Sequence, residues 1–185
     1  MKRTFVYCGT WEASALPGAE NDTGKGEGVY AFELDTSSGA LIPVNLAYAK
    51  DAGVLAVSPD QKYLYGANES RDFGGIPASG GGVTAFSIDQ KTGGVSRIND
   101  SIAYGACTAY VSVSKSGRYL LAANHGSHFD LACRYVPDGH FAVIGLMGSG
   151  RAGVYTVDKK SGRILKKVYE TIVPNCCSIR FAELM

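Results

Sequence analysis

The sequence has 185 residues, of which 45% are hydrophobic and 19% are charged, and its formal net charge at pH 7 is +1. This composition is typical of a globular protein, and the near-neutral charge without a basic stripe argues against nucleic acid or an anionic membrane surface as a partner. No stretch approaches the roughly 20 apolar residues of a membrane helix and the first residues form no secretory signal, so we expect a cytoplasmic protein.

Short strands joined by glycine-containing turns are the expected local structure. The 24 glycines mark turns, and the 11 tyrosines favour strands. Residues 4–48 predict three strands: TFVYCGTW forms the first, and GVYAFELDTSSGALIPV at 28–44 forms a hairpin. Gly39 lies in the polar turn of this hairpin and supplies the positive φ that such turns need.

The next segment predicts a complete unit of four antiparallel strands at about 54–58, 63–68, 82–89 and 94–101. Its first hairpin is AVSPDQKYLYGANE and its second is GVTAFSIDQKTGGVSRI, each with a polar turn between two strands. No segment of a dozen residues shows the 3.6-residue period of a helix. We therefore predict a four-stranded meander.

Both hairpins recur further along the chain. SVSKSGRYLLAANH at 112–125 repeats the first hairpin, and AGVYTVDKKSGRILKKV at 152–168 repeats the second. We therefore predict a second four-stranded unit over about 110–170, which carries a long insertion at 125–151. CSIRFA at 177–182 predicts the opening strand of another unit.

Repeated four-stranded units of this length predict an all-β fold, a β-propeller of four-stranded antiparallel blades. We expect one partial-propeller domain over 1–185, which consists of a blade part at 4–48, a blade at 54–104, the blade with the insertion at 110–170 and the start of a blade at 177–182. The twelve predicted strands make about three blades, whereas a closed ring needs at least about four. We expect other blades of a longer protein, or self-association, to cover the uncovered blade faces.

Long polar connections gather at one end of the predicted blades. In a meander the connections between second and third strands share this end with the connections between blades, and 11–27, 69–81 and 125–151 lie there. Glu69 and His125 occupy equivalent repeat positions, and a carboxylate and an imidazole exchange protons near neutral pH. We predict that they are the catalytic residues; the alternative is that they bond loop backbone.

Four further residues are candidates for substrate binding. Arg180, on a predicted innermost strand, would hold a carboxylate or phosphate, or else form a salt bridge between blades. Tyr110 would donate a hydrogen bond or pack half-buried. His128 and Asn124 lie at the same end, where the asparagine has the alternative of capping its hairpin by bonding backbone.

No metal or organic cofactor is expected. His125 and His128 are close in sequence, but no zinc-ligand pattern surrounds them. The five cysteines are an odd number without metal-ligand spacing, which indicates reduced thiols. They are Cys8, Cys107, Cys133, Cys176 and Cys177.

Four segments occur in the order LAVSPDQKYLYGANE (55–69), GGVTAFSIDQKTGGV (81–95), VSVSKSGRYLLAANHG (111–126) and PNCCSIRF (174–181). Together they resemble the lactonase family of seven-bladed β-propellers, which includes propeller-type 6-phosphogluconolactonases and carboxy-cis,cis-muconate cyclases. The resemblance covers about the N-terminal half of a family member and implies a cytosolic enzyme that acts on a small-molecule lactone or sugar acid without a cofactor.

The sequence departs from the family at two places. Tyr110 and Cys177 stand where the family commonly has histidine, whereas Arg180 is retained. The leading hypothesis is hydrolysis of a sugar lactone, in which Glu69 or His125 activates water against the carbonyl. The alternatives are a muconate-type cyclase that closes a lactone, and a non-catalytic propeller that binds a ligand or is an inactive fragment.

Overall fold

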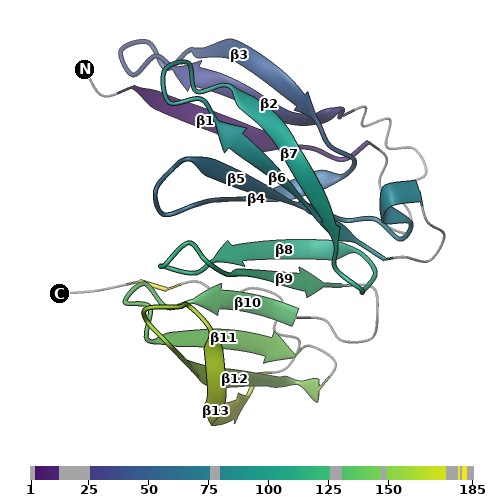
Figure 1. The fold of residues 1–185 in the computed structure, drawn as a ribbon, viewed down its shortest axis with the longest axis vertical. Coiled ribbons are helices and arrows are strands. Elements are labelled where there is room, and N and C mark those ends of the chain that lie inside the picture. The colour runs from purple at the N-terminus through teal and green to yellow at the C-terminus, as the bar shows by residue number, and fades with distance from the viewer. Residues whose placement is uncertain are drawn as a thin grey trace.

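The computed structural model describes residues 3–12, 26–75, 80–125, 131–146, 149–173, 179 and 181–182. Thirteen strands and one short 3-10 helix, η1 (Phe73–Gly75), make up its regular structure (Figure 1). The strands form four antiparallel sheets, which confirms the all-β prediction and the partial propeller of four-stranded blades. In the part of the chain that is described, no helix has the length and apolar character needed to cross a membrane.

The first two sheets follow the sequence prediction closely. Sheet 1 consists of β1 (Thr4–Gly9), β2 (Gly28–Leu34) and β3 (Leu41–Tyr48). Sheet 2 consists of β4 (Ala52–Val57), β5 (Tyr63–Asn68), β6 (Gly82–Ile88) and β7 (Val95–Ile102). The two sheets share one register, because Ala31 faces Asn45 across β2 and β3 as Ala85 faces Asn99 across β6 and β7.

The segment 110–170 was predicted to form one blade, but in the structure its strands belong to two separate sheets. β8 (Thr108–Val113) and β9 (Leu120–Asn124) form sheet 3 by themselves. Sheet 4 consists of β10 (Leu131–Tyr135), β11 (Phe141–Leu146), β12 (Arg151–Val157) and β13 (Ile164–Ile172). Sheet 3 lies between sheets 2 and 4 (Figure 1).

The expected insertion at 125–151 therefore contains two strands of its own. A Pro-Asp-Gly turn at 137–139 joins β10 to β11, and Gly139 adopts φ +75°, which glycine does without a steric penalty. β11 then pairs with β12, the next strand along the chain. Pairing with β11 closes only a short loop, which costs less entropy than a longer one. The β12–β13 hairpin therefore belongs to sheet 4, and β9 does not pair with β12.

The principal core lies between sheets 1 and 2. Phe86, Leu64 and Val95 of sheet 2 are fully buried and belong to one cluster with Val29 and Ala31 of sheet 1. Burying a side chain of this size stabilises the fold by about 1.5–3 kcal/mol. This packing of one sheet face on the next fixes the relative position of the loops at the sheet ends.

Three polar turns repeat the same aspartate. Asp35, Asp89 and Asp158 follow β2, β6 and β12, and each accepts hydrogen bonds from backbone N–H groups of its own turn. At Asp89 and Asp158 these bonds are the main cause that favours the charged carboxylate and lowers its pKa, whereas at Asp35 serine hydroxyls are the main cause and the backbone bond adds to them. The hairpin turns predicted at these positions are confirmed.

Of the expected opening strand at 177–182, the structure describes Ile179, Phe181 and Ala182 and assigns none of them to a strand. Among the described residues, β1 pairs only with β2 and β9 only with β8. Each of these second-strand equivalents therefore has one open edge, and self-association through such uncovered surfaces stays a prediction.

Candidate functional site

The two ends of the sheets differ in chemistry. At one end, which we call the turn end, short turns join the first strand of a sheet to the second and the third strand to the fourth. The opposite end, called the loop end, carries the connections between sheets at 49–51 and 103–107 and the residues after β1, β5 and β9. The predicted site residues that the structure describes lie on or near elements that reach the loop end.

A repeated hydrogen bond fixes the backbones of Glu69 and His125. The Glu69 N–H donates to the carbonyl of Asp51 at 3.0 Å, and the His125 N–H donates to the carbonyl of Cys107 at 2.8 Å. Asp51 and Cys107 both have a positive φ, +51° and +56°, although neither is glycine. The equivalence of Glu69 and His125 that the repeat suggests is therefore also seen in their backbone bonding.

A second bond joins these two positions into one path. The Cys107 N–H donates to the carbonyl of Ser70 at 2.8 Å, so the backbones of Glu69–Ser70 and His125 are both tied to Cys107. Glu69 is half-buried and His125 is exposed. A non-glycine residue with a positive φ costs free energy, and such residues cluster at functional sites. Asp51 and Cys107 therefore mark this part of the loop end as a candidate functional site.

The loop end also contains an ion pair that sequence reasoning missed. The Nζ of Lys50 lies 3.2 Å from an Asp72 carboxylate oxygen, and the Ser70 hydroxyl donates to the same carboxylate at 2.9 Å. The Ser70 hydroxyl and then Lys50 lower the pKa of Asp72, and Asp72 in turn raises the pKa of Lys50. Lys50 lies in the connection before β4, and no feature of the surrounding sequence singled it out.

Asp51 is the other missed residue. Its side chain is buried, and one carboxylate oxygen accepts a hydrogen bond from the Glu12 N–H at 2.9 Å. The carboxylate thus joins the residues after β1 to the connection before β4, while the Asp51 carbonyl receives Glu69. The Lys-Asp-Ala stretch that contains Asp51 gives no sequence signal, because the role of this aspartate depends on Glu12 in a distant segment of the chain.

Tyr110 contacts an arginine from the neighbouring sheet. Arg134 on β10 donates from Nη1 to the Tyr110 hydroxyl at 2.6 Å, and both side chains are half-buried. Because the hydroxyl accepts this bond, its own hydrogen is oriented away from Arg134. Arg134 lies in the segment 125–151 that was expected to be an insertion, and β10 was not predicted there.

Asn124 uses both ends of its amide inside the protein. Its Oδ1 accepts from the Thr108 hydroxyl at 2.7 Å, and its Nδ2 donates to the Ala103 carbonyl at 3.3 Å. Asn68 does the same one sheet earlier, with the Thr84 hydroxyl at 3.0 Å and the Lys50 carbonyl at 2.6 Å. This repeat supports the alternative in which the asparagine holds the connection between sheets.

His128 and Arg180 lie outside the described residues. Within the part of the chain that is described, no three histidine, cysteine, aspartate or glutamate side chains gather as metal ligands would.

Cys107 and Cys133 are buried thiols, and burial raises the pKa of Cys133 to about 12, so it is held protonated.

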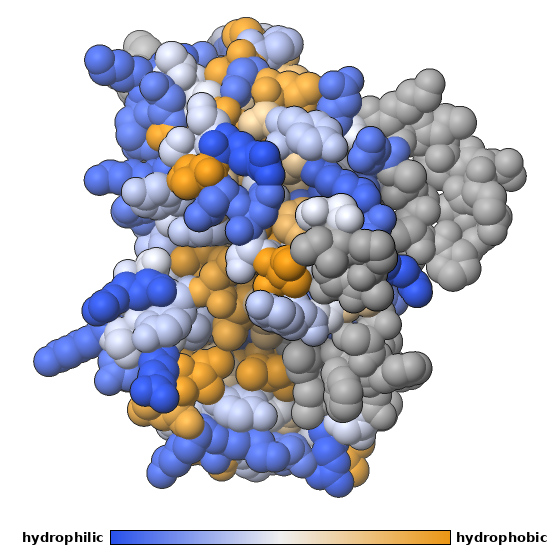
Figure 2. Space-filling model, turned by 45° about the vertical axis from the view of Figure 1, so that its right-hand side comes forward, coloured by the Kyte–Doolittle hydropathy of each residue, from blue (hydrophilic) through white to orange (hydrophobic). Residues whose placement is uncertain are grey.

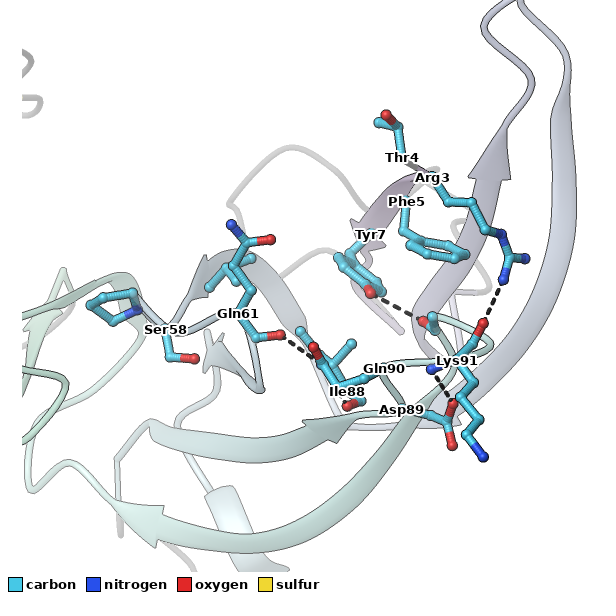
Figure 3. A pocket seen from close by; sticks show the side chains of 13 residues that line it. Arg3, Thr4, Phe5, Tyr7, Ser58, Gln61, Ile88, Asp89, Gln90 and Lys91 are labelled. Carbon is cyan, nitrogen blue, oxygen red and sulfur yellow. Dashed lines mark hydrogen bonds between the residues drawn. The ribbon is translucent and has the colours of Figure 1, made fainter. Parts of the chain in front are cut away.

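A hollow of about 760 Å³ lies at the turn end, away from these residues, beside β1 and the turns of sheet 2 (Figure 3). Its polar groups bond to one another: the Tyr7 hydroxyl donates to the Gly93 carbonyl at 3.0 Å, and Gln90 Nε2 donates to the Gln61 carbonyl at 3.0 Å. The hollow follows the open edge of β1, where sheet 1 lacks the first strand that sheet 2 has in β4. We read it as a consequence of that open edge.

Comparison with known proteins decides the family. The family model described as "Lactonase, 7-bladed beta-propeller" matches residues 5–131. The chain belongs to this lactonase family. The match runs from β1 to the start of β10, so it includes sheets 1 to 3 and ends where sheet 4 begins.

Two curated relatives are named 6-phosphogluconolactonase. The protein from Formosa agariphila is 30% identical over 109 residues, which are 58% of this chain and 30% of that protein. The protein from Bacillus subtilis is 34% identical over 107 residues, which are 56% of this chain and 28% of that protein. The matched region thus spans less than a third of either relative.

Solved structures share the fold at lower identity. A putative 6-phosphogluconolactonase from Bacteroides uniformis has a TM-score of 0.72 and 16% identity, with 91% of this chain and 55% of that chain covered. A periplasmic gluconolactonase from Pseudomonas aeruginosa has a TM-score of 0.71 and 19% identity, with 94% and 56% covered. The chain spans about half the length of these structures.

Proposed function

We propose that this chain forms part of the site of a sugar-lactone hydrolase in which water attacks the lactone carbonyl. The observation that carries the proposal is the backbone path at the loop end, in which Cys107 bonds both His125 and Ser70, the residue after Glu69, in a chain of the lactonase family. Relatives named 6-phosphogluconolactonase support a phosphorylated sugar lactone as the substrate class. The cytoplasm is the proposed compartment, and the free thiols Cys8, Cys107 and Cys133 support it.

Glu69 and His125 would act as the acid/base groups. One group, as carboxylate or neutral imidazole, accepts a proton from water as the water oxygen attacks the carbonyl. The other group, in its protonated form as imidazolium or carboxylic acid, delivers a proton to the leaving ring oxygen. General acid–base catalysis of this kind contributes about 10²–10⁴-fold in rate. Because their backbones are already fixed by hydrogen bonds, these two residues would lose less conformational entropy when substrate binds.

Tyr110 and Arg134 would hold the anionic group of the substrate. The guanidinium has further N–H donors beyond the one that it gives to Tyr110, and a phosphate or carboxylate is its matching acceptor. Asn124 would reach substrate only with the N–H that it does not use on Ala103. His128 and Arg180 stay proposed binding residues, on sequence grounds alone.

The test is hydrolysis of 6-phosphogluconolactone by the 185-residue chain and by the double variant Glu69→Gln, His125→Ala. We expect the double variant to lose about 100-fold or more in kcat/KM. The matched control is His140→Ala with Glu170→Gln, because it makes the same chemical changes at the β10–β11 turn and on β13. A double variant that keeps activity within twofold of the control contradicts the proposal.

Product binding provides a readout that does not depend on turnover. Titration with 6-phosphogluconate should give a saturable signal, and Arg134→Gln should weaken the affinity at least about tenfold, since a hydrogen bond to a charged group contributes about 1.5–3 kcal/mol. Binding that Arg134→Gln leaves unchanged contradicts the role given to the Tyr110–Arg134 pair. Ring closure of a muconate in place of lactone hydrolysis would support the cyclase alternative instead.

A further inference from the structure

Sheet 3 is the one two-stranded sheet among the described strands, and its second strand has an open edge. Within the described residues β9 pairs with β8 alone, whereas its equivalent β5 pairs with β4 on one side and β6 on the other. β9 ends on Asn124 as β5 ends on Asn68, and both asparagines make the same kind of bonds. β9 therefore has the features of a blade strand that lacks its outer neighbours.

A hollow of about 370 Å³ lies beside this open edge, and we call it the β6–β7 hollow. Val83 and Ala85 on β6 line one wall, and Leu120 and Ala122 on β9 line another. Figure 2 shows hydrophobic side chains gathered along the middle of one face of the molecule, between more hydrophilic margins. Leu120 is only half-buried, although its equivalent on β5, Leu64, is fully buried.

The corresponding surface on sheet 1 is filled. Val29 and Ala31 hold the β2 positions that Val83 and Ala85 hold on β6, as the shared register shows. Against Val29 and Ala31 pack Phe86 and Val95, which belong to the third and fourth strands of the next sheet. The β6–β7 hollow is the place where the third and fourth strands of sheet 3 would pack.

Asn99 provides an independent sign of what fits there. Its equivalent Asn45 binds the backbone of Val95 twice, since Nδ2 donates to the carbonyl at 2.7 Å and Oδ1 accepts from the N–H at 3.0 Å. Asn99 lines the β6–β7 hollow, and its amide makes no hydrogen bond within the described structure. An amide in this position is complementary to the backbone of a fourth strand, at the residue that follows the turn.

The chain contains a hairpin with the matching pattern in β12–β13. Tyr155 and Ile164 stand at the same distances from the turn aspartate Asp158 as Phe86 and Val95 do from Asp89. β12 also pairs with β11 in the register that β6 uses on β5, because Leu146 faces Arg151 as Asn68 faces Gly82. The same register on β9 would place Asn124 opposite Arg151 and Ala123 opposite Ala152.

We propose that the open edge of β9 and the β6–β7 hollow form a second docking position for the β12–β13 hairpin of the same chain. In this arrangement β12 leaves β11 and pairs with β9, Tyr155 and Ile164 fill the hollow, and the Asn99 amide binds the Ile164 backbone. The number of strand pairs is unchanged, because β12 exchanges one second-strand partner for another. Residues 125–150 connect β9 to β12 and are long enough for the transfer at about 3.3 Å per residue.

The same chain is a better source of the hairpin than a second copy. A hairpin from another copy would also have to leave its own β11, and it would lack the high effective concentration of a tethered segment. The transfer would free β10 and β11 from β12 and convert 125–151 into a long connection at the loop end. Two packings of one sequence that differ by a few kcal/mol are a known form of conformational switch.

Paired cysteines test the two positions against each other. Ala123→Cys with Ala152→Cys reports β12 on β9, and Gly145→Cys with Ala152→Cys reports β12 on β11, where Gly145 faces Ala152. The control Ala122→Cys with Ala152→Cys moves one residue along β9, so its side chain points to the other face. Under mild oxidation we expect intrachain disulfides in the first two variants, at least fivefold above the control by peptide mapping.

Asn99→Ala makes the test specific to the hollow. In the Ala123→Cys, Ala152→Cys background it should lower the disulfide yield at least threefold, and in the Gly145→Cys, Ala152→Cys background it should leave the yield unchanged. A protein that forms only the Gly145–Ala152 bridge overturns the second position. Disulfide-linked dimers in place of intrachain bridges overturn the assignment to the same chain.

Discussion

The Asn45 amide is the best place to measure how one sheet holds the next. Asn45→Ala removes two hydrogen bonds to Val95, of 2.7 and 3.0 Å, and Val95 is only 1% exposed. A net contribution of about 1 kcal/mol per bond predicts a loss of about 2 kcal/mol in the free energy of unfolding. With a urea slope of about 2 kcal/mol per M, the unfolding midpoint should fall by about 1 M.

Asn99→Ala is the matched control, because Asn99 holds the same register position on sheet 2 without a hydrogen bond from its amide. Its effect on the described arrangement should stay within about 0.5 kcal/mol. Urea unfolding followed by far-UV circular dichroism measures both variants against the parent chain. Equal midpoints for the two variants would refute the reasoning that Asn45 joins sheet 1 to sheet 2.

Three further outcomes follow from the described geometry. Gly93 has φ +74° and a Cβ there would lie 2.2 Å from an aromatic ring on β1, so Gly93→Ala should lower stability by about 1–3 kcal/mol in thermal unfolding. Hydrogen bonds from its turn, first from the Thr92 N–H, hold the pKa of Asp89 below its usual 3.8. This aspartate therefore stabilises the fold above about pH 4, and the stabilisation is lost as the pH falls. In Asp89→Ala the urea midpoint should decrease less between pH 5 and pH 3 than it does in the parent chain. Exposed Cys8 should react with a thiol reagent in the native protein, whereas buried Cys133, whose pKa is raised to about 12, should react only after unfolding, as mass mapping would show; equal rates would contradict the sheet 4 packing.

The strands and turns of the first two sheets could be predicted because each depends on local chemistry. Alternating apolar residues define a strand, and the turns at 59–62 and 90–93 combine polar residues with positive φ at Gln61 and Gly93. The expected ends of β5 at 63–68 agree with the structure. These features need no information about distant residues.

The strands β10 and β11 were missed although a local signal exists. VPDGH has the same Pro-Asp chemistry as SPDQK, and alternating residues flank it, but the position after a recognised hairpin favoured an insertion. The equivalence of Glu69 and His125 could be predicted from the repeat, and the bonds to Asp51 and Cys107 give it a structural basis. Arg134 beside Tyr110 could not be predicted without β10.

The sequence by itself determined the strand type, the repeat and the family resemblance, because period-two patterns and turn residues are read within a few neighbouring positions. Only the tertiary structure decided that β12 pairs with β11 and not with β9, since this choice depends on the packing of whole sheets. It also decided that Asn45 binds the next sheet while Asn99 faces a hollow. Identical residues at equivalent positions acquire different roles because their partners come from segments far away in the chain.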